Sequence, residues 1–569
     1  MSLVLCVTLV PLLPLVTAIL VMAGGPGSQQ RRTEIGVWPV VAAFAGSVAA
    51  LGLVAAGGPI RVSFYEPGAA ATLAFPLGFH VDRLSAIMMT LITAVSAIIY
   101  LYSMQYMQQD RGYARFLSLL TLTDFVLLCM VSSANLLMLF VFWQLLSWLL
   151  YLLSHNRTHQ ATLNGAFKTF TLLRAADMAF LMGIVLAHAL YGTVEFQELF
   201  DRAAATPVAL SLLPGIEISG ATAVTLLIFV GAMGKSAQIP MHIWLPGSLY
   251  APTPVHAMLH AGIINAGGFL LNRLAPLYGL SPATLHVVFV VGMLTAVLGA
   301  SMMLVQNDIK KMLGFSTIGQ MGYMIMECGL GAFALAVFHL VAHGLFKATV
   351  FLNCGNVIHK VRQEPTPPHP GRGIEEPELS RFTWLTGILT SLLMPLVILL
   401  LTHGVLHIPL RDAQGTVIFL FFIWVTSSQA ILTLTRLRAV ASWKVSAAML
   451  VTLLFVVFTY LFAAEAFTHF LYPDPQAVTR YFQAAALPGR LFDMLVAGTT
   501  LLTVLSWVYL YARAHGREMP MPAWVRALHI RLYVLFMNRL YLDMMYERFA
   551  RGIMRLAHGL DKPSFGGSR

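Results

Sequence analysis

The stretch GAMGKSAQIPMHIWLPGSLYAPTPVHAMLHA, residues 231–261, is the part of the chain that decides its fold. It places Lys235 directly after an apolar run, because the residues 221–234 that precede it carry no charge. Pro240 then interrupts the helix that this run predicts. A lysine in hydrocarbon costs about 2.5 to 3.5 kcal/mol on insertion scales, so such a group is usually kept for a function. A helix broken at membrane depth is tolerated where it lines an enclosed or watery cavity.

The composition of the chain is that of a membrane protein. Hydrophobic residues make up 58%, charged residues make up 10%, and the mean hydropathy is +0.77. A soluble domain carries about 25% charged residues. We therefore predict an all-α, polytopic membrane protein. The net charge of +11 lies mostly in loops and in the tail, where it orients the chain and meets anionic lipid, so it does not indicate nucleic-acid binding.

Apolar runs of membrane-spanning length recur along the chain and predict about fourteen to fifteen helices. The predicted spans are 3–23, 34–56, 82–107, 113–132, 135–153, 163–191, 220–238, 241–277, 284–305, 309–328, 330–358, 380–403, 416–436, 446–467 and 489–513. Ser248–Pro254 is expected to divide the segment 241–277. The basic loop 29–32 places the N-terminus outside the cytoplasm.

The ionisable residues are distributed unevenly. Arg362–Glu378 is a loop rich in proline and charge, and the helices before it carry many titratable groups. Between Arg381 and His403 there is no Asp, Glu, Lys, Arg or His. The tail Pro522–Lys562 alternates arginine with apolar residues, as expected of a basic amphipathic segment on a membrane surface or against a partner.

Three charged residues share one predicted helix, in the stretch NGAFKTFTLLRAADMAF. Arg174 and Asp177 are three residues apart and can form an ion pair. A self-satisfied structural pair and a functional pair are equally good interpretations. Lys168 lies near the start of the helix, where its side chain could extend to the surface. We favour a function for Lys168, because it has no partner nearby in the sequence.

Two histidine pairs have a spacing of four residues. They are His256 with His260, and His339 with His343, and Lys347 continues the second stripe on the same helical face. HxxxH can also bind zinc, but neither pair has the glutamate of HExxH, and no third ligand is evident. A proton relay is therefore the better interpretation. Core histidines bonded to backbone carbonyls remain an alternative for His256 and His339.

The sequence offers no motif for catalysis by this chain alone. It has no nucleotide-binding loop, no flavin motif and no metal cluster, and the four cysteines lack metal-binding spacing. We expect no cofactor. Two isolated acids, Asp82 and Asp124, lie near a helix end and in mid-helix.

Several stretches resemble one family, the antiporter-like subunits shared by respiratory complex I and the Mrp sodium/proton antiporters. The resemblance covers roughly residues 80–360 and includes the tail. The matching stretches are HVDRLSAIMM (80–89), GKSAQIPMHIWLPGSLYAPTPVHAMLHA (234–261), QNDIKKMLGFSTIGQMGYM (306–324), FHLVAHGLFKATVFL (338–352) and NRLYLDMMYERF (538–549).

The resemblance implies two inverted five-helix repeats, each with a broken helix. It divides the chain into N-terminal helices (1–110), a first repeat (111–277), a second repeat (278–436), C-terminal helices (437–515) and the basic tail (516–569). The proton-path residues that it implies are Lys168, Lys235, His260, His339, His343 and Lys347. It also implies a multi-pass protein of the bacterial inner membrane.

Two positions depart from the family's pattern. Complex I relatives have a glutamate that controls the nearby lysine at the position of Gln144, and a glutamine carries no charge to act on Lys235. After Pro395, in the second broken helix, the family's lysine motif is missing, and His403 is the nearest ionisable group. Both departures count against the standard complex I proton cycle.

These departures resemble a side branch of the family, the membrane subunits of DAB inorganic-carbon accumulation complexes. Their peripheral partner, DabA, resembles a zinc β-carbonic anhydrase. The resemblance implies a subunit that couples a gradient of protons or other cations to CO2 or bicarbonate accumulation by a DabA-like zinc protein. The alternatives are a proton-pumping subunit of complex I, a Mrp-type cation/proton antiporter subunit, and a non-conducting scaffold.

Overall fold

A computed structural model describes the larger part of the chain. The described residues are 2–23, 29–66, 75–155, 160–213, 215–248, 251–363, 462–463, 465–495, 497–498, 501, 505 and 522–560. The predicted spans 380–403 and 416–436, with Pro395 and His403, lie outside these ranges, as do most of the spans 446–467 and 489–513.

Long apolar helices follow the predicted spans closely, which confirms the all-α membrane class. In the described ranges, eight helices are long and apolar enough to cross a membrane, and two shorter apolar helices accompany them. The eight long helices are α2 (Gln29–Gly57), α3 (Arg83–Tyr106), α4 (Tyr113–Val131), α5 (Leu136–Ser154), α6 (Gln160–Tyr191), the segment Thr253–Arg273, α13 (Pro282–Leu304) and α15 (Phe333–Gln363). The two shorter ones are α1 (Ser2–Met22) and α8 (Gly220–Lys235). A more polar helix, α14 (Ile309–Gly329), lies between α13 and α15 in the sequence.

The segment after α8 is broken, as its prolines predict, and it breaks more often than expected. The pieces are η2 (Met241–Ile243), α9 (Trp244–Gly247), α10 (Thr253–Ala261), η4 (Ile263–Asn265), α11 (Ala266–Arg273) and α12 (Ala275–Gly279). The break at Gly262, between α10 and η4, was not predicted. A Cβ at Gly262 would lie 2.9 Å from Cδ1 of Leu127, so the missing side chain lets this break approach α4.

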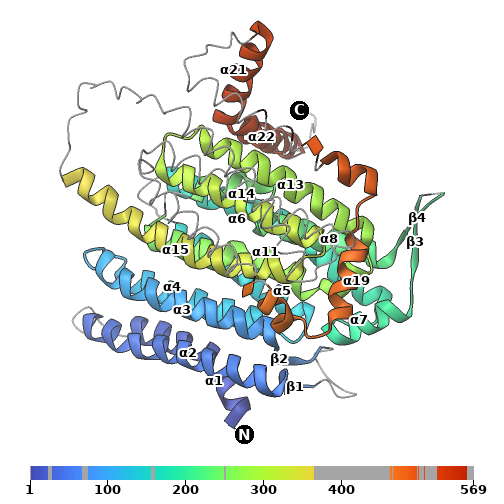
Figure 1. Ribbon diagram of the computed structural model, residues 1–569. Coiled ribbons are helices and arrows are strands. Elements are labelled where there is room, and N and C mark those ends of the chain that lie inside the picture. The colour runs from blue at the N-terminus through green and yellow to red at the C-terminus, as the bar shows by residue number, and fades with distance from the viewer. Residues whose placement is uncertain are drawn as a thin grey trace, which may run out of the picture.

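One end of the helix bundle carries short elements that hydropathy does not predict (Figure 1). They are the hairpin β1 (Ile60–Tyr65) and β2 (Leu77–Val81), the hairpin β3 (Ala209–Leu213) and β4 (Ile216–Ser219), α7 (Phe196–Ala205) and α19 (Pro475–Ala485). The basic residues Arg31, Arg111 and Lys310 lie at the opposite helix ends. The topology predicted from the basic loop 29–32 assigns that opposite end to the cytoplasm, so we name the end with the hairpins the outer end.

The described tail is helical and lies against the bundle. It consists of α21 (Ala523–Met537), η5 (Arg539–Tyr541) and α22 (Leu542–Leu560). In Figure 1 the tail helices lie at one side of the bundle, and α21 contacts α13.

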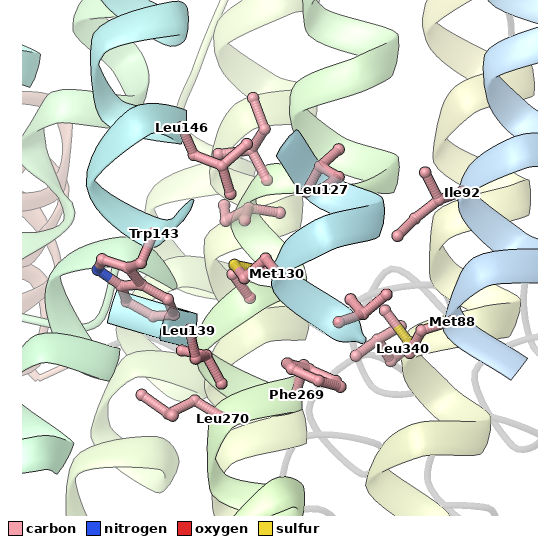
Figure 2. Packing of buried hydrophobic residues seen from close by; sticks show 14 of the residues in the cluster. Met88, Ile92, Leu127, Met130, Leu139, Trp143, Leu146, Phe269, Leu270 and Leu340 are labelled. Atoms are coloured by element: carbon pink, nitrogen blue, oxygen red, sulfur yellow. The ribbon is translucent and has the colours of Figure 1, made fainter. Parts of the chain in front are cut away.

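Apolar side chains from helices far apart in the sequence meet in one packed core. Figure 2 shows α3, α4, α5, α11 and α15 contributing to it, and the labelled residues are Met88, Ile92, Leu127, Met130, Leu139, Trp143, Leu146, Phe269, Leu270 and Leu340. In lipid, helix association depends on such close packing rather than on exclusion of water. The packing fixes α5, and with it Trp143, next to the broken segment.

Glycines bring α13 and α14 unusually close. A Cβ at Gly292 would lie 2.3 Å from the backbone N of Met326, and a Cβ at Gly322 would lie 2.3 Å from the backbone N of Ala296. Small residues that let backbones approach are a common basis of helix pairing in membranes. They hold α14 in a fixed rotation, which matters for the polar side chains on its other face.

Candidate functional site

Lys235 is the last residue of α8 and is fully buried where the helix breaks. Its Nζ donates hydrogen bonds to the backbone O of Trp143, at 3.0 Å, and to Oγ of Ser147, at 2.6 Å. The same Nζ lies 4.9 Å from the centroid of the Trp143 ring. The lysine therefore reaches across to α5 rather than to the membrane surface.

The carboxylate that accompanies Lys235 comes from α6. Asp177 is buried, and its Oδ1 accepts a hydrogen bond of 2.6 Å from Nε1 of Trp143. Nη2 of Arg174 lies 3.5 Å from the other oxygen, Oδ2. The charges of Asp177 and Arg174 both act on Lys235. The predicted Arg174–Asp177 pair exists, and the structure shows that it belongs to the surroundings of Lys235.

Two structural details explain this arrangement. A Cβ at Gly234 would lie 2.3 Å from Cβ of Ala176, so glycine lets α8 pack directly on α6 beside Asp177. Gln144 is half-buried on α5, and its backbone carbonyl accepts a hydrogen bond of 3.1 Å from Nη2 of Arg174. The neutral Gln144 thus lies beside the charged cluster without adding charge to it.

Lys168 lies nearer the cytoplasmic end of α6 and does have a partner. It forms an ion pair with Asp543 of α22, and Arg539 lies 3.3 Å from the second oxygen of that aspartate. Asp543 is 375 residues further along the chain, so no partner of Lys168 is evident from its sequence neighbours. The ion pair joins the tail to the helix that carries Asp177.

Two histidines of α10 form part of a second cluster. His256 and His260 are fully buried, and the ring of His260 stacks on Phe351 of α15 at 4.3 Å. The groups His256, His343 and Lys347 interact electrostatically with His260. Among the described residues, neither ring nitrogen of His260 has a hydrogen-bond partner. Lys235 and His260 are therefore not joined directly, and a proton passing between them needs a bridging water.

The stripe on α15 is paired with α14. Nζ of Lys347 donates to Oγ of Ser316 at 2.8 Å. His339 makes two side-chain contacts, of 3.2 Å with Oε2 of Glu327 and of 2.9 Å with Oε1 of Gln320. His339 is thus bonded to side chains, not to backbone carbonyls. Glu327 was not among the predicted site residues, although an acid in the otherwise apolar run IMECG was a signal for it.

The acid Asp82 lies at the outer end, apart from both clusters. It caps α3 by accepting a hydrogen bond from the backbone N of Ser85 at 2.9 Å, and it pairs with Arg273 at 2.7 Å. Burial raises the pKa of the Asp82 carboxyl, but Arg273 outweighs this effect and the pKa falls to about 2. Nearby, burial lowers the pKa of His80 to about 4. Asp82 therefore joins α3 to α11.

The other isolated acid, Asp124, is buried on α4. Its Oδ1 accepts a hydrogen bond of 2.5 Å from Oγ of Ser96 on α3, and its Oδ2 has no hydrogen-bond partner in the described part of the chain. Among the described residues, Asp124 makes no hydrogen bond or ion pair with either cluster. Its location between α3 and α4 makes it a feature of the N-terminal helices.

The described residues thus place a buried lysine at a helix break beside a carboxylate, and a histidine–lysine stripe lies on α15. A family model described as NADH:quinone oxidoreductase/Mrp antiporter, transmembrane, matches residues 133–367. A second model, for the N-terminus of complex I chain 5, matches residues 69–117.

A relative named "Probable inorganic carbon transporter subunit DabB1", from Halothiobacillus neapolitanus, is 38% identical over 96% of this chain and 97% of its own length. NADH-quinone oxidoreductase subunit L of Neisseria meningitidis is 37% identical over 56% of this chain, which spans about half (48%) of that subunit. The chain therefore belongs to the complex I/Mrp antiporter-like family and, within it, to the DabB group.

Solved structures share the fold at low sequence identity. A chain of the Mrp complex from Dietzia sp. DQ12-45-1b has a TM-score of 0.56 and 22% identity, over 99% of this chain and 61% of that one. A chain of respiratory complex I from Thermus thermophilus has a TM-score of 0.58 and 18% identity, over 85% of this chain and 100% of that one. These likenesses support the architecture only.

Proposed function

We propose that this subunit conducts protons across the bacterial inner membrane and couples their gradient to inorganic-carbon accumulation by a peripheral, zinc-containing, carbonic-anhydrase-like partner. The observation that carries the proposal is Lys235, fully buried at a helix break with Asp177 beside it. An intramembrane ionisable residue with a defined partner is a functional site by default.

The arrangement around Lys235 supports a switch. Burial disfavours a charged amine, and a nearby carboxylate favours it. Trp143 bonds to both Lys235 and Asp177, so a small movement of α5 changes the interaction between them. Such a movement would cause Lys235 to take up or release a proton.

The proposed path follows the predicted residues. Protons run down their gradient through two groups of side chains, with water between the groups. One group lies on α6 and α8, and the other lies on α10 and α15. The members are Lys168, Lys235, His260, His339, His343 and Lys347.

The carbon substrate is inferred from the DabB relative, whose name refers to inorganic carbon transport. The zinc-containing partner is inferred from the resemblance to the DAB complexes alone. In this proposal the chemistry on carbon takes place in the partner, and this chain supplies only the movement of charge. The division of the chain into repeats at 111–277 and 278–436 remains part of the proposal.

A second candidate is a proton-pumping subunit of complex I or a Mrp-type cation/proton antiporter subunit. The family model that matches residues 133–367 favours it. Gln144 counts against it. The resemblance implies a glutamate at this position in complex I relatives, whereas this chain has a neutral glutamine.

Purification of the tagged subunit in mild detergent, followed by mass spectrometry and zinc analysis of co-purifying proteins, separates the candidates. Membranes without the tagged chain are the control. A single large zinc-bearing peripheral protein is the expected result. A set of other antiporter-like, quinone-site or iron–sulfur subunits would refute the proposed coupling to carbon.

A further inference from the structure

Two polar stripes face each other across α14 and α15. The stripe on α14 consists of residues spaced by four, three and four positions, which lie on one helical face: Ser316, Gln320, Tyr323 and Glu327. The stripe on α15 consists of His339, His343 and Lys347. Hydrogen bonds join the stripes near both ends, through Lys347 and Ser316 at 2.8 Å and through His339 and Glu327 at 3.2 Å.

Glu327 is the acidic member of this arrangement. Its side chain is 5% exposed, and its Oε2 contacts Nδ1 of His339. Its other oxygen, Oε1, is buried and has no hydrogen-bond partner within the described residues. The glycine contacts between α13 and α14 fix the rotation of α14, so Glu327 is held toward α15. A buried carboxyl with one unused oxygen can accept a further proton donor.

Glu327 lies at the outer end of the stripes. Ser316 and Glu327 are separated by roughly 16 Å along the helix axis, at 1.5 Å per residue, which is about half the thickness of the hydrocarbon core. The turn after α14 packs on α19, because a Cβ at Gly331 would lie 2.4 Å from the backbone O of Tyr481. Both observations place Glu327 next to the outer layer of the protein.

A polar cavity lies close to this point. The residue after Glu327, Cys328, accepts a hydrogen bond of 3.7 Å from Nδ2 of Asn272. Asn272 is among the residues that line a cavity of 1010 Å³ at the outer end, together with Asp82 and Arg273. Water in a cavity of this size can exchange protons with groups near its wall.

A proton path through Lys347 and His343 needs a further group that connects it to the outer side of the membrane. The stretch 382–402 of the second half carries no ionisable residue, so it offers no titratable side chain for that purpose. His339 lies between, with its ring 6.3 Å from that of His343. Glu327 is bonded to His339 on the side away from Lys347.

We propose that Glu327 is the proton carrier at the outer end of the path, an inference that rests on the proposed proton conduction. On inward transfer, Glu327 takes up a proton from the outer water. The proton then passes from Oε2 of Glu327 to Nδ1 of His339, which leaves a carboxylate and an imidazolium. His339 returns to its neutral form when it passes a proton on to His343.

Proteoliposomes that contain the subunit with its co-purified partner test this inference. Proton uptake is driven by a potassium diffusion potential and followed with an enclosed pH dye, for wild type, Lys235→Ala and Glu327→Gln. Glutamine keeps an acceptor for His339 but cannot carry a proton. Glu198→Gln is the matched control, because Glu198 is an outer-end acid exposed on α7 and paired with Arg202.

The expected result is a flux reduced roughly tenfold or more in Glu327→Gln, and unchanged in Glu198→Gln, with normal assembly of both. Wild-type flux in Glu327→Gln, together with loss of flux in Lys235→Ala, would overturn the proposed role of Glu327 and leave the proposed function in place. No flux in wild type, or flux that Lys235→Ala leaves intact, would overturn the proposed function as well.

A second variant covers the case in which Glu327→Gln does not assemble. Glu327→Met replaces the carboxyl with an apolar side chain of similar length, which suits the buried position. The same loss of flux is expected. Wild-type flux in this variant would show that the Glu327–His339 contact serves only to hold α14 against α15, and would overturn the proposal.

Discussion

Lys235 and Asp177 are hydrogen-bonded to the same residue, Trp143, one through its backbone and the other through its side chain. The carbonyl of Trp143 accepts from Nζ of Lys235 at 3.0 Å, and its indole donates to Oδ1 of Asp177 at 2.6 Å. Three helices, α5, α6 and α8, therefore meet at one buried charge cluster. The carboxylate of this cluster is Asp177 on α6, whereas the neighbouring residue on α5, Gln144, is neutral.

Replacing Asp177 with asparagine should reduce proton flux roughly tenfold or more, because it removes the negative charge that acts on Lys235. Asparagine retains an oxygen that can accept from Trp143, so assembly should persist. Flux into proteoliposomes is the measurement, and Asp201→Asn on the exposed face of α7 is the control. Flux equal to wild type would show that Asp177 serves only as a structural partner of Arg174.

Replacing Gln144 with glutamate should impair coupling rather than improve it. The new carboxylate would lie beside the Arg174–Asp177 pair, where it would compete for Arg174 and add a second negative charge near Lys235. Coupled carbon uptake in cells is the measurement, with Gln144→Asn as the neutral control. Behaviour indistinguishable from wild type would mean that position 144 has lost its influence on the lysine.

Replacing Asp543 with asparagine should loosen the tail helix. The ion pair with Lys168 joins partly exposed side chains, and such pairs contribute about 0–1 kcal/mol. Amide hydrogen exchange in α22 should therefore rise above that of the control, by up to about fivefold. Glu547→Gln, an exposed acid on the same helix, should leave the exchange unchanged. Equal exchange in both variants would contradict an anchoring role for the Lys168–Asp543 pair.

Stability should depend on pH through His80, which faces Asp82, Arg273 and Arg61. Its pKa is lowered from 6.5 to about 4, so between these values the unfolded chain binds the proton more readily and stability falls as pH falls. The pKa of the Asp82 carboxyl is lowered from 3.8 to about 2. The contribution of its ion pair with Arg273 to stability is therefore lost only at lower pH, between pH 3.8 and pH 2.

The thermal unfolding midpoint in detergent, measured from pH 7 to pH 4, tests this expectation. The variant His80→Gln cannot take up a proton, so its midpoint should fall less over this range than that of wild type. Parallel curves for the two proteins would contradict the assignment of the pH dependence to His80.

The sequence was sufficient for features that depend on neighbouring residues. The length of each apolar run predicted α3 and α13 to within a few residues, and Pro240 predicted the break after Lys235. The four-residue spacing of His339, His343 and Lys347 predicted their shared face. Each of these features follows from local periodicity or from the chemistry of one residue.

Contacts between distant segments could not be predicted in this way. Asp543 meets Lys168 across 375 residues, and only the folded tail brings them together. Asp177 was paired with its sequence neighbour Arg174, whereas its approach to Lys235 depends on the close packing of Gly234 on Ala176. The strands of the outer hairpins, of four to six residues, are too short to register in a hydropathy pattern.

The central claim is that Lys235 carries protons through this subunit, and proton flux in Lys235→Ala tests it most directly. The subunit and its partner are reconstituted together, and flux is driven by a diffusion potential, with Lys311→Ala at the cytoplasmic end of α14 as the control. We expect Lys235→Ala to lose roughly nine-tenths of the flux or more while assembling normally, and Lys311→Ala to retain it. Wild-type flux in an assembled Lys235→Ala complex would contradict the account and would favour a scaffold that does not conduct.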